Sequence, residues 1–269
     1  MTTYHRITPN IELQMVKDYN AGLRVKDLRL KYGFSHNPCT RTLKKHGVKM
    51  HYENKNSQKW TVTQDYFKII DSEAKAYWLG FIYADGNVHL SECRNVFNFN
   101  LKEEDKYMVE KLRRDISYTG PLFTKRYKNV HYSPACVLSV SNKEFCQCLI
   151  GVGCIPRKSL VLRFPTVEQV PSRFISYFIR GYFDGDGCVA RRHKKTSAVS
   201  VSILGTEHFL LGVKQLLLEQ GLSYLSVRKK GNQYILHISG SDDVYRFSNF
   251  IYQNKGEHFL IRKWVKFID

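Results

Sequence analysis

The sequence predicts an α+β fold in which one αββαββα unit is given twice, behind a small all-α domain at the N-terminus. Two similar stretches head the copies, WLGFIYADG at residues 78–86 and IRGYFDGDG at residues 179–187. Their aspartates, Asp85 and Asp186, stand 101 residues apart, and the same order of helices and strands follows each. An element order that is repeated at a domain-sized offset indicates an internal duplication.

Residues 1–52 predict three short helices. Thr8 followed by Pro9 is a capping and first-turn signal, and apolar residues at helical spacing place helices at about 9–20, 25–32 and 37–46. Short helix, turn, basic helix is the order of a helix-turn-helix module, whose last helix lies in the DNA major groove. The candidate DNA contacts of that helix are Arg41, Lys44 and Lys45. A three-helix bundle used for packing or protein contact is the alternative, and the polar residues 53–65 are expected to form a linker.

The two copies are expected at residues 66–170 and 171–269. The first copy predicts strands near 88–90, 95–101, 121–128 and 135–141, with helices near 104–116 and 143–150. The second predicts strands near 188–192, 198–204, 223–229 and 233–239, with helices near 207–220 and 242–252. A basic stretch closes each copy, PRKSLVLRFP in the first and IRKWVKFID in the second.

The strands alternate apolar and polar residues, so each sheet is expected to have one polar face. In the second strand, for example, Phe97 and Phe99 point inward while Asn98 and Asn100 point outward. Outward Asn, Ser and His can read base edges, and basic residues can hold phosphates. The candidate DNA contacts outside the N-terminal module are Asn98, Asn100, Arg126, Lys128, Ser139, Ser141, Lys158, Arg191, Arg192, Lys194, Ser200, Ser202, Arg228, Lys230, His237 and Lys263.

Composition points to a polyanionic partner. The chain of 269 residues has a formal net charge of +18, and residues 1–60 alone hold twelve Lys or Arg against four Asp or Glu. Such a balance favours nucleic acid, with a membrane surface as the weaker alternative. The N-terminus has no signal-peptide core, no apolar run is long enough to span a bilayer, and the seven cysteines form no CxxC pair. We therefore expect a protein of the cell interior that is not secreted, with reduced thiols and no zinc site.

The two similar stretches also predict a metal site. Gly80 and Ala84 in the first, and Gly181 and Gly185 in the second, are small residues at i and i+4, which lets two helices approach closely. That packing places Asp85 and Asp186 side by side at helix C-termini, where negative charge is disfavoured. A divalent cation removes the conflict, and hard oxygen ligands favour Mg²⁺, with Mn²⁺ as a plausible substitute.

These stretches resemble the paired motifs of the LAGLIDADG homing endonucleases, in the form in which one chain carries both copies. The acidic eighth position of the motif falls on Asp85 and Asp186, while the sixth position is Tyr83 in one copy and Asp184 in the other. The resemblance implies two antiparallel sheets that form a saddle over DNA, with the motif helices between them, in a monomer. It also implies that the carbonyl groups of Ala84 and Gly185 add metal ligands.

The resulting hypothesis is a Mg²⁺-dependent, site-specific double-strand DNA endonuclease that hydrolyses one phosphodiester on each strand of a long asymmetric site. Lys102 and Lys143 are candidate catalytic lysines of the first copy, whereas Gly205 and Ser239 stand at comparable places in the second. Either one strand is cut more slowly or another lysine serves the second copy. An intron-RNA maturase and a DNA-binding transcription regulator on the same fold are the alternatives, and an enzyme embedded in an intein is not expected.

Overall fold

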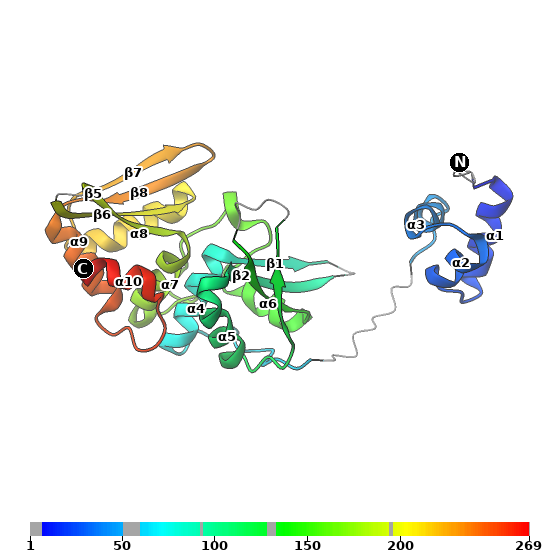
Figure 1. Ribbon diagram of the computed structural model, residues 1–269, viewed down its shortest axis with the longest axis horizontal. Helices are drawn as coiled ribbons and strands as arrows, with labels where there is room; N and C mark the ends of the chain where they lie inside the picture. The colour runs from blue at the N-terminus through cyan, green and yellow to red at the C-terminus, as the bar shows by residue number, and fades with distance from the viewer. Residues whose placement is uncertain (1–6, 51–59, 92–93, 128–132, 194–195, 269) are drawn as a thin grey trace. The chain divides into compact units, whose positions relative to one another are not determined.

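The computed structural model describes residues 7–50, 60–91, 94–127, 133–193 and 196–268 (Figure 1). The chain divides into two compact units, Met1–Ser57 and Gln58–Asp269. Two of the candidate DNA contacts, Lys128 and Lys194, lie outside the described residues, as do the side chains of Arg191 and Arg192.

The N-terminal unit contains three helices at the predicted places: α1 (Pro9–Asn20), α2 (Val25–Tyr32) and α3 (His36–Lys45). A small core of Tyr19, Leu28 and Leu43 joins them, one residue from each helix. Gly33 ends α2 in the left-handed conformation at φ 70°, which glycine adopts without steric cost. Helix spacing and apolar periodicity were therefore sufficient to predict this unit.

The larger unit contains two four-stranded antiparallel sheets with the same strand order. The first sheet runs β1-β2-β4-β3 and consists of β1 (Gly86–Leu90), β2 (Asn95–Lys102), β3 (Leu122–Lys125) and β4 (Ala135–Val140). The second runs β5-β6-β8-β7 and consists of β5 (Gly187–His193), β6 (Thr196–Gly205), β7 (Leu225–Lys230) and β8 (Gln233–Ile238). The identical order confirms the predicted α+β fold and its duplication.

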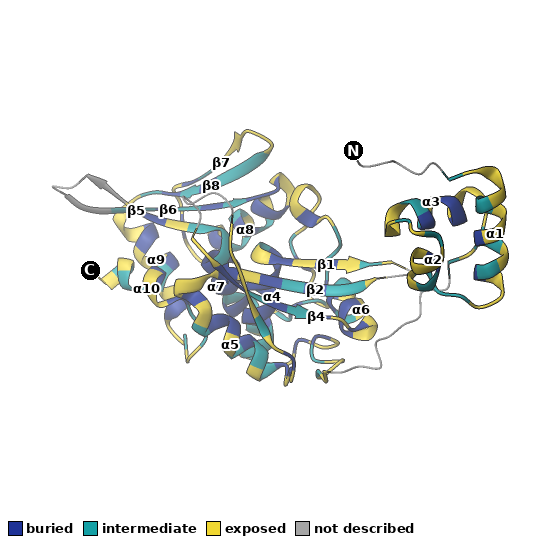
Figure 2. Cartoon of the chain, turned by 45° about the vertical axis from the view of Figure 1, so that its right-hand side comes forward, coloured by how far each residue is buried: buried dark blue, intermediate teal, exposed yellow. Residues whose placement is uncertain are grey.

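Helices pack on one face of each sheet and between the two sheets (Figures 1 and 2). The central pair is α4 (Glu73–Asp85) and α7 (Ile175–Asp186). The others are α5 (Lys106–Asp115), α6 (Lys143–Gly151), α8 (Glu207–Glu219), α9 (Ser241–Tyr252) and α10 (Ile261–Ile268), with short 3-10 turns η1 (Glu103–Asp105), η2 (Lys158–Leu160) and η3 (Ser172–Phe174). The helix predicted from residue 104 thus begins as a 3-10 turn, and the two basic closing stretches differ, since one forms η2 and the other α10.

A continuous apolar core joins the two repeats. Phe97, Phe99 and Leu138 of the first sheet and Val201 and Leu236 of the second are buried in it together with both central helices. The chain enters this unit earlier than expected, because the backbone of Thr61 is bonded to Thr119 and that of Thr63 to Ile116. Residues 60–65 of the predicted linker therefore belong to the larger unit, and residues 53–59 lie outside the described residues. Within the described part of the chain, every helix is too short or too polar to cross a bilayer.

Candidate active site

The two central helices touch through their backbones at two glycines. A Cβ atom added at Gly80 would lie 1.9 Å from the carbonyl oxygen of Phe178, and one added at Gly181 would lie 1.9 Å from that of Tyr77. Real Cβ atoms do not approach backbone atoms so closely, so both positions require glycine, which has no side chain. One turn later the same faces still meet, since a Cβ at Gly185 would lie 2.2 Å from that of Ala84. The predicted small-residue stripe is the contact surface of α4 and α7.

This packing brings the two motif aspartates together. Asp85 is the last residue of α4 and Asp186 the last residue of α7, and the Asp85 carboxylate lies beside Gly185, 3.0 Å from the position of its missing Cβ. Burial, followed by the charge of Asp186, raises the pKa of Asp85 to about 7. Asp85 as a whole residue is nevertheless exposed, so it remains accessible to solvent and ligands. Burial also raises the pKa of Asp186.

Two buried lysines flank the aspartates, one from each repeat. Lys158 is 8% exposed and its Nζ donates to the Ala84 carbonyl at 3.1 Å. Lys263 is 5% exposed and its Nζ donates to the carbonyls of Phe183 at 2.7 Å and Gly185 at 3.1 Å. Carbonyl groups at a helix C-terminus carry partial negative charge and lack helical partners, so they attract cations. The two lysine ammonium groups donate hydrogen bonds to these helix-end carbonyls at equivalent places in the two repeats.

The lysines and aspartates act across the repeats. Among the cations that favour the ionised form of Asp85, Lys263 has the largest effect, whereas for Asp186 it is Lys158. Burial lowers the pKa of Lys263 to about 8, against the opposing effect of Asp184 and of the aspartate pair. Lys158 and Asp186 also line one cavity, so an acid of the second repeat and a lysine of the first share one candidate centre.

A polar cavity of about 110 Å³ opens beside Asp186. Its lining comes from both repeats: Tyr83, Ala84, Lys158, Ser159 and Leu162 from the first, and Tyr182, Asp186, Gly205, Thr206 and Gln233 from the second. The cavity is large enough to hold water. Water there would lie next to a carboxylate and an ammonium group, a combination that suits hydrolytic chemistry.

Comparison with known proteins agrees with this fold. Residues 173–252, which include α7 and the second sheet, match the family model described as LAGLIDADG-like domain. The second repeat is therefore similar to a LAGLIDADG-like domain. The homing endonuclease I-WcaI bound to its DNA recognition sequence shares the fold, with a TM-score of 0.56, 16% identity, and coverage of 76% of this chain and 91% of that one. The meganuclease I-SmaMI bound to uncleaveable DNA was also found, at 12% identity, a TM-score of 0.49, and coverage of 72% and 86%.

Two archaeal proteins match parts of this chain in sequence. The probable translation initiation factor IF-2 of Methanocaldococcus jannaschii is 29% identical over 221 residues, which is 76% of this chain and 17% of that protein. Elongation factor 2 of Methanopyrus kandleri is 36% identical over 91 residues, which is 34% of this chain and 7% of that protein. The chain thus spans less than a fifth of the length of either relative.

The two lysines predicted to assist catalysis lie at opposite ends of the first sheet. Lys102 pairs with Ala135 at the start of β4, and Lys143 follows Val140 at the end of that strand. Five residues of strand between Ala135 and Val140 span about 17 Å. Lys102 is largely exposed and lies 3.7 Å from Glu104, and Lys143 is also exposed. The structure therefore does not bring the pair together at Asp85.

The lysines beside the acids were predicted instead as DNA contacts. Both lysines are buried, at 8% and 5% exposed, unlike the exposed Arg126, Arg228 and Lys230 at the strand ends. The sequence did contain the signal, because these two lysines are 105 residues apart, close to the aspartate offset of 101. Two further polar side chains at the site, those of Tyr182 and Gln233, were missed because they lie mid-helix and at a strand start without any motif.

The outward faces of the two sheets carry rows of polar residues. Asn98 stands between Asn87 and Ser139 across the first sheet, and Ser202 and His237 stand between Cys188 and Ser226 across the second. Among the candidate DNA contacts on the sheets and their tips, the half-buried ones are Asn98, Ser139, Ser200, Ser202 and His237, and the exposed ones are Asn100, Arg126, Ser141, Arg228 and Lys230. Each sheet therefore has the expected polar face.

In the N-terminal unit, the basic residues of α3 divide into two groups. Arg41 and Lys44 are exposed on the same helix face as Asn37. Lys45 is turned toward α1, where its Nζ lies 2.7 Å from Oε2 of Glu12. The free basic face of α3 thus consists of Arg41 and Lys44, and Lys45 stabilises the packing of α3 against α1.

The donors around the acids suit a hard divalent cation. Across the residues that the structure describes, no three His, Cys, Asp or Glu side chains are clustered as a ligand set. The candidate ligands are the two carboxylates with the carbonyls of Ala84 and Gly185, an all-oxygen set of the kind Mg²⁺ prefers. Both carbonyls already accept hydrogen bonds from ammonium groups, so the site attracts positive charge in this conformation.

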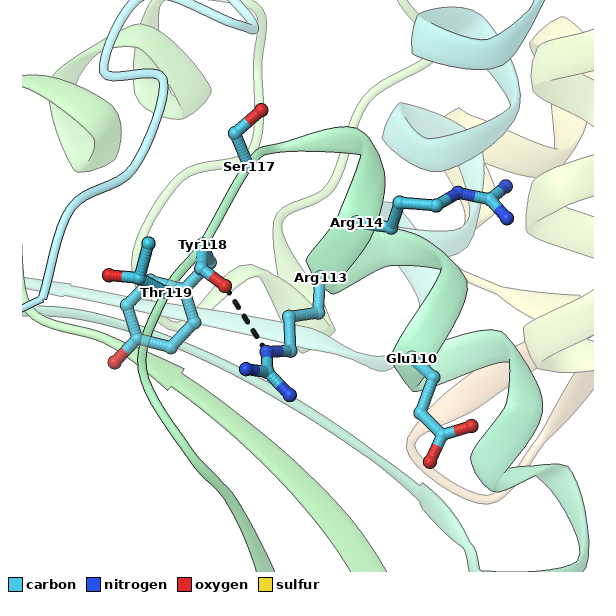
Figure 3. Close-up of a pocket in the computed structure, with 6 residues that line it drawn as sticks. All are labelled: Glu110, Arg113, Arg114, Ser117, Tyr118 and Thr119. Carbon is cyan, nitrogen blue, oxygen red and sulfur yellow. Dashed lines mark hydrogen bonds between the residues drawn. The ribbon is translucent and has the colours of Figure 1, made fainter.

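A second hollow lies at the C-terminal end of α5, away from the acid pair (Figure 3). It is lined by Glu110, Arg113, Arg114, Ser117, Tyr118 and Thr119. The Arg113 side chain folds back so that its Nε donates to the Tyr118 carbonyl at 3.1 Å. This arginine therefore closes the turn after α5 and takes no part in the candidate site.

Proposed function

We propose that this protein is a site-specific double-strand DNA endonuclease that hydrolyses one phosphodiester on each strand of a long, asymmetric target with the help of a divalent metal ion. The observation that carries the proposal is the pair Asp85 and Asp186 at the abutting ends of α4 and α7, with one buried lysine for each acid. Two acids and two lysines match the requirement of two scissile bonds. An asymmetric target follows from two repeats that differ in sequence.

The acids are the proposed metal ligands. Asp85 and Asp186 would hold Mg²⁺, or Mn²⁺ in its place, with the carbonyl oxygens of Ala84 and Gly185 as further ligands. When bound, the ion supplies an activated water and withdraws electron density from the phosphate oxygens. The raised pKa of Asp85 supports this role, because two desolvated carboxylates at helix C-termini favour a bound cation.

The lysines are proposed to stabilise the reacting phosphate. Lys158 and Lys263 are fixed by hydrogen bonds to helix-end carbonyls, so their charge is oriented before substrate arrives. Preorganised positive charge in a partly dehydrated site stabilises the negative charge that develops during phosphodiester hydrolysis. The pKa of Lys263, about 8, also allows this ammonium group to exchange a proton near neutral pH.

DNA is the proposed partner of both units. The polar rows of the two sheets would read base edges, and exposed Arg126, Arg228 and Lys230 would hold phosphates. Arg41 and Lys44 of α3 would extend the contact, as in a helix-turn-helix. The net charge of +18 supports a polyanionic partner and predicts affinity that falls steeply with salt.

The proposal is tested by selecting cleaved DNA from a randomised library of linear duplexes. The full chain is incubated with the library and Mg²⁺, and fresh ends are captured by ligation and sequenced. We expect one consensus of more than a dozen base pairs with a break in each strand, and no product in EDTA. A chain that binds duplex DNA but releases no ends with Mg²⁺ or Mn²⁺ would show that the nuclease assignment is wrong.

A further inference from the structure

The first turn of α10, which carries Lys263, is held by side chains of the first repeat. Arg262 makes a two-pronged ion pair with Asp105 of η1: its Nε lies 3.0 Å from both carboxylate oxygens and its Nη2 lies 2.8 Å from Oδ2. Asp105 is 2% exposed. The backbone N–H of the preceding residue, Ile261, donates to the Tyr107 hydroxyl at 3.0 Å. Both contacts cross from the second repeat to the first.

A third contact fixes the same turn from within the second repeat. The backbone N–H of Leu260 donates to Oδ2 of Asp184 at 2.8 Å, and Asp184 also accepts from the hydroxyls of Tyr77 and Tyr252. Three successive residues, from Leu260 to Arg262, are therefore anchored, and Lys263 is the next residue. The rotation of α10, and with it the place of the Lys263 ammonium, is set by these anchors.

The lysine of the first repeat is anchored by different chemistry. The hairpin after the motif helix is three residues longer in the second repeat, where Gly187 pairs with Ile203, than in the first, where Gly86 pairs with Phe99, so the position equivalent to Asp105 is Phe209. The segment of Lys158 is held instead by Thr206, whose hydroxyl donates to the carbonyl of Leu162, just beyond η2. An ion pair of fixed geometry thus holds the helix turn that carries Lys263, whereas a neutral hydroxyl group holds the segment that carries Lys158. The duplicated halves have diverged at the contact that positions the lysine.

We infer that the Asp105–Arg262 pair is a positioning device for Lys263, and that its loss slows the cutting of one DNA strand selectively. The inference rests on the proposed nuclease function. A planar guanidinium held at two points fixes both distance and angle, which a single hydrogen bond does not. Displacing a reacting group by about 1 Å can slow a reaction roughly 100-fold. Since Lys158 lines the cavity beside Asp186 and Lys263 does not, the effect falls on one of the two centres.

The test is a single-turnover assay on the selected target with a different label on each strand. For Asp105→Asn we expect one strand to be cut about tenfold more slowly or worse, and the other to change less than about twofold, so that nicked DNA accumulates. The slow strand must be the one that Lys263→Met also slows. In the double variant, Asp105→Asn should add nothing to Lys263→Met on that strand, because a positioning residue acts only through the group that it positions.

Glu257→Gln is the matched control. Glu257 forms an ion pair with Arg114 at 3.2 Å that also joins the first repeat to the segment before α10, but both side chains are exposed. We expect no strand bias from this change. Where Asp105→Asn fails to fold by thermal melting, Arg262→Lys replaces it, since lysine keeps the charge and loses the two-pronged geometry.

The outcomes separate the two levels of the proposal. Equal slowing of both strands by a folded Asp105→Asn or Arg262→Lys variant, no slowing at all, or additivity with Lys263→Met would overturn the positioning role alone. A wild-type chain that does not cut, or a folded Lys263→Met variant that cuts both strands at full rate, would instead count against the proposed function.

Discussion

Gly181 packs directly against the backbone of Tyr77, so closely that a methyl group on its α-carbon would lie 1.9 Å from the Tyr77 carbonyl oxygen. Gly80 makes the reciprocal contact with the carbonyl of Phe178. Because both obstacles are backbone atoms, neither can be moved by turning a side chain. The distance between α4 and α7, and therefore between the two acids at their ends, depends on these glycines.

Gly181→Ala is expected to destabilise the larger unit by about 3 kcal/mol, the upper range for inserting a methyl group into a packed interior. The helices must separate to admit the new Cβ, and this separation also moves Asp85 away from Asp186. Urea unfolding followed by tryptophan fluorescence gives the change in free energy.

Gly151→Ala is the control for that substitution. Gly151 ends α6 and has no atom within 4 Å of its missing Cβ. The added methyl group should be neutral or stabilise by up to about 1 kcal/mol, since alanine favours helix. Equal losses from both alanines would mean that close backbone contact is not what the motif glycines provide.

Asp85→Asn and Asp186→Asn are each expected to reduce double-strand cleavage about 100-fold or more, because each removes one of the two charged ligands proposed for the metal ion. DNA affinity should be retained, since asparagine keeps the shape and removes one of two repelling charges. Gel-shift and cleavage assays on the selected target measure the two properties separately. Full cutting by either variant would refute the assignment of the site.

Lys158→Met is expected to slow one strand about tenfold or more, and that strand should not be the one slowed by Lys263→Met, because Lys158 lines the cavity beside Asp186 and Lys263 does not. The strand-specific label assay described for Asp105 measures the rates. Lys102→Met is the comparison, since Lys102 is exposed on the first sheet. If Lys102→Met slows cleavage more than Lys158→Met does, the exposed lysine is the catalytic one.

Removal of residues 1–57, the whole N-terminal unit, should weaken DNA binding and shorten the protected footprint without abolishing cleavage. The unit carries eleven Lys or Arg against four Asp or Glu, so the slope of affinity against salt should also become shallower. Footprinting of the full and shortened chains, with binding measured at several salt concentrations, tests this. An unchanged footprint would argue that the unit does not bind the target.

Much of the fold could be predicted because its signals are local. The three N-terminal helices, the strand alternation around Phe97 and Phe99, and the repeat of strand order all follow from periodicity within short windows. The less accurate predictions concern where segments begin and end, because tertiary contacts determine those boundaries. The expected linker reached residue 65, whereas Thr61 and Thr63 are already bonded to the body, and that bonding depends on residues more than fifty positions away.

The candidate site was predictable only in part. The sequence by itself determined the duplicated fold, because the order of helices and strands repeats along the chain. It also determined the two glycine-bearing helices and the acids at their ends, because each helix end lies within one contiguous motif. Only the tertiary structure decided which lysines stand beside those acids. Lys158 lies on a 3-10 turn and Lys263 on a terminal helix, each more than seventy residues from its own aspartate, so no local pattern relates them. Their place depends on chain crossings and on anchors such as Asp105 to Arg262, which form only when the two repeats pack together.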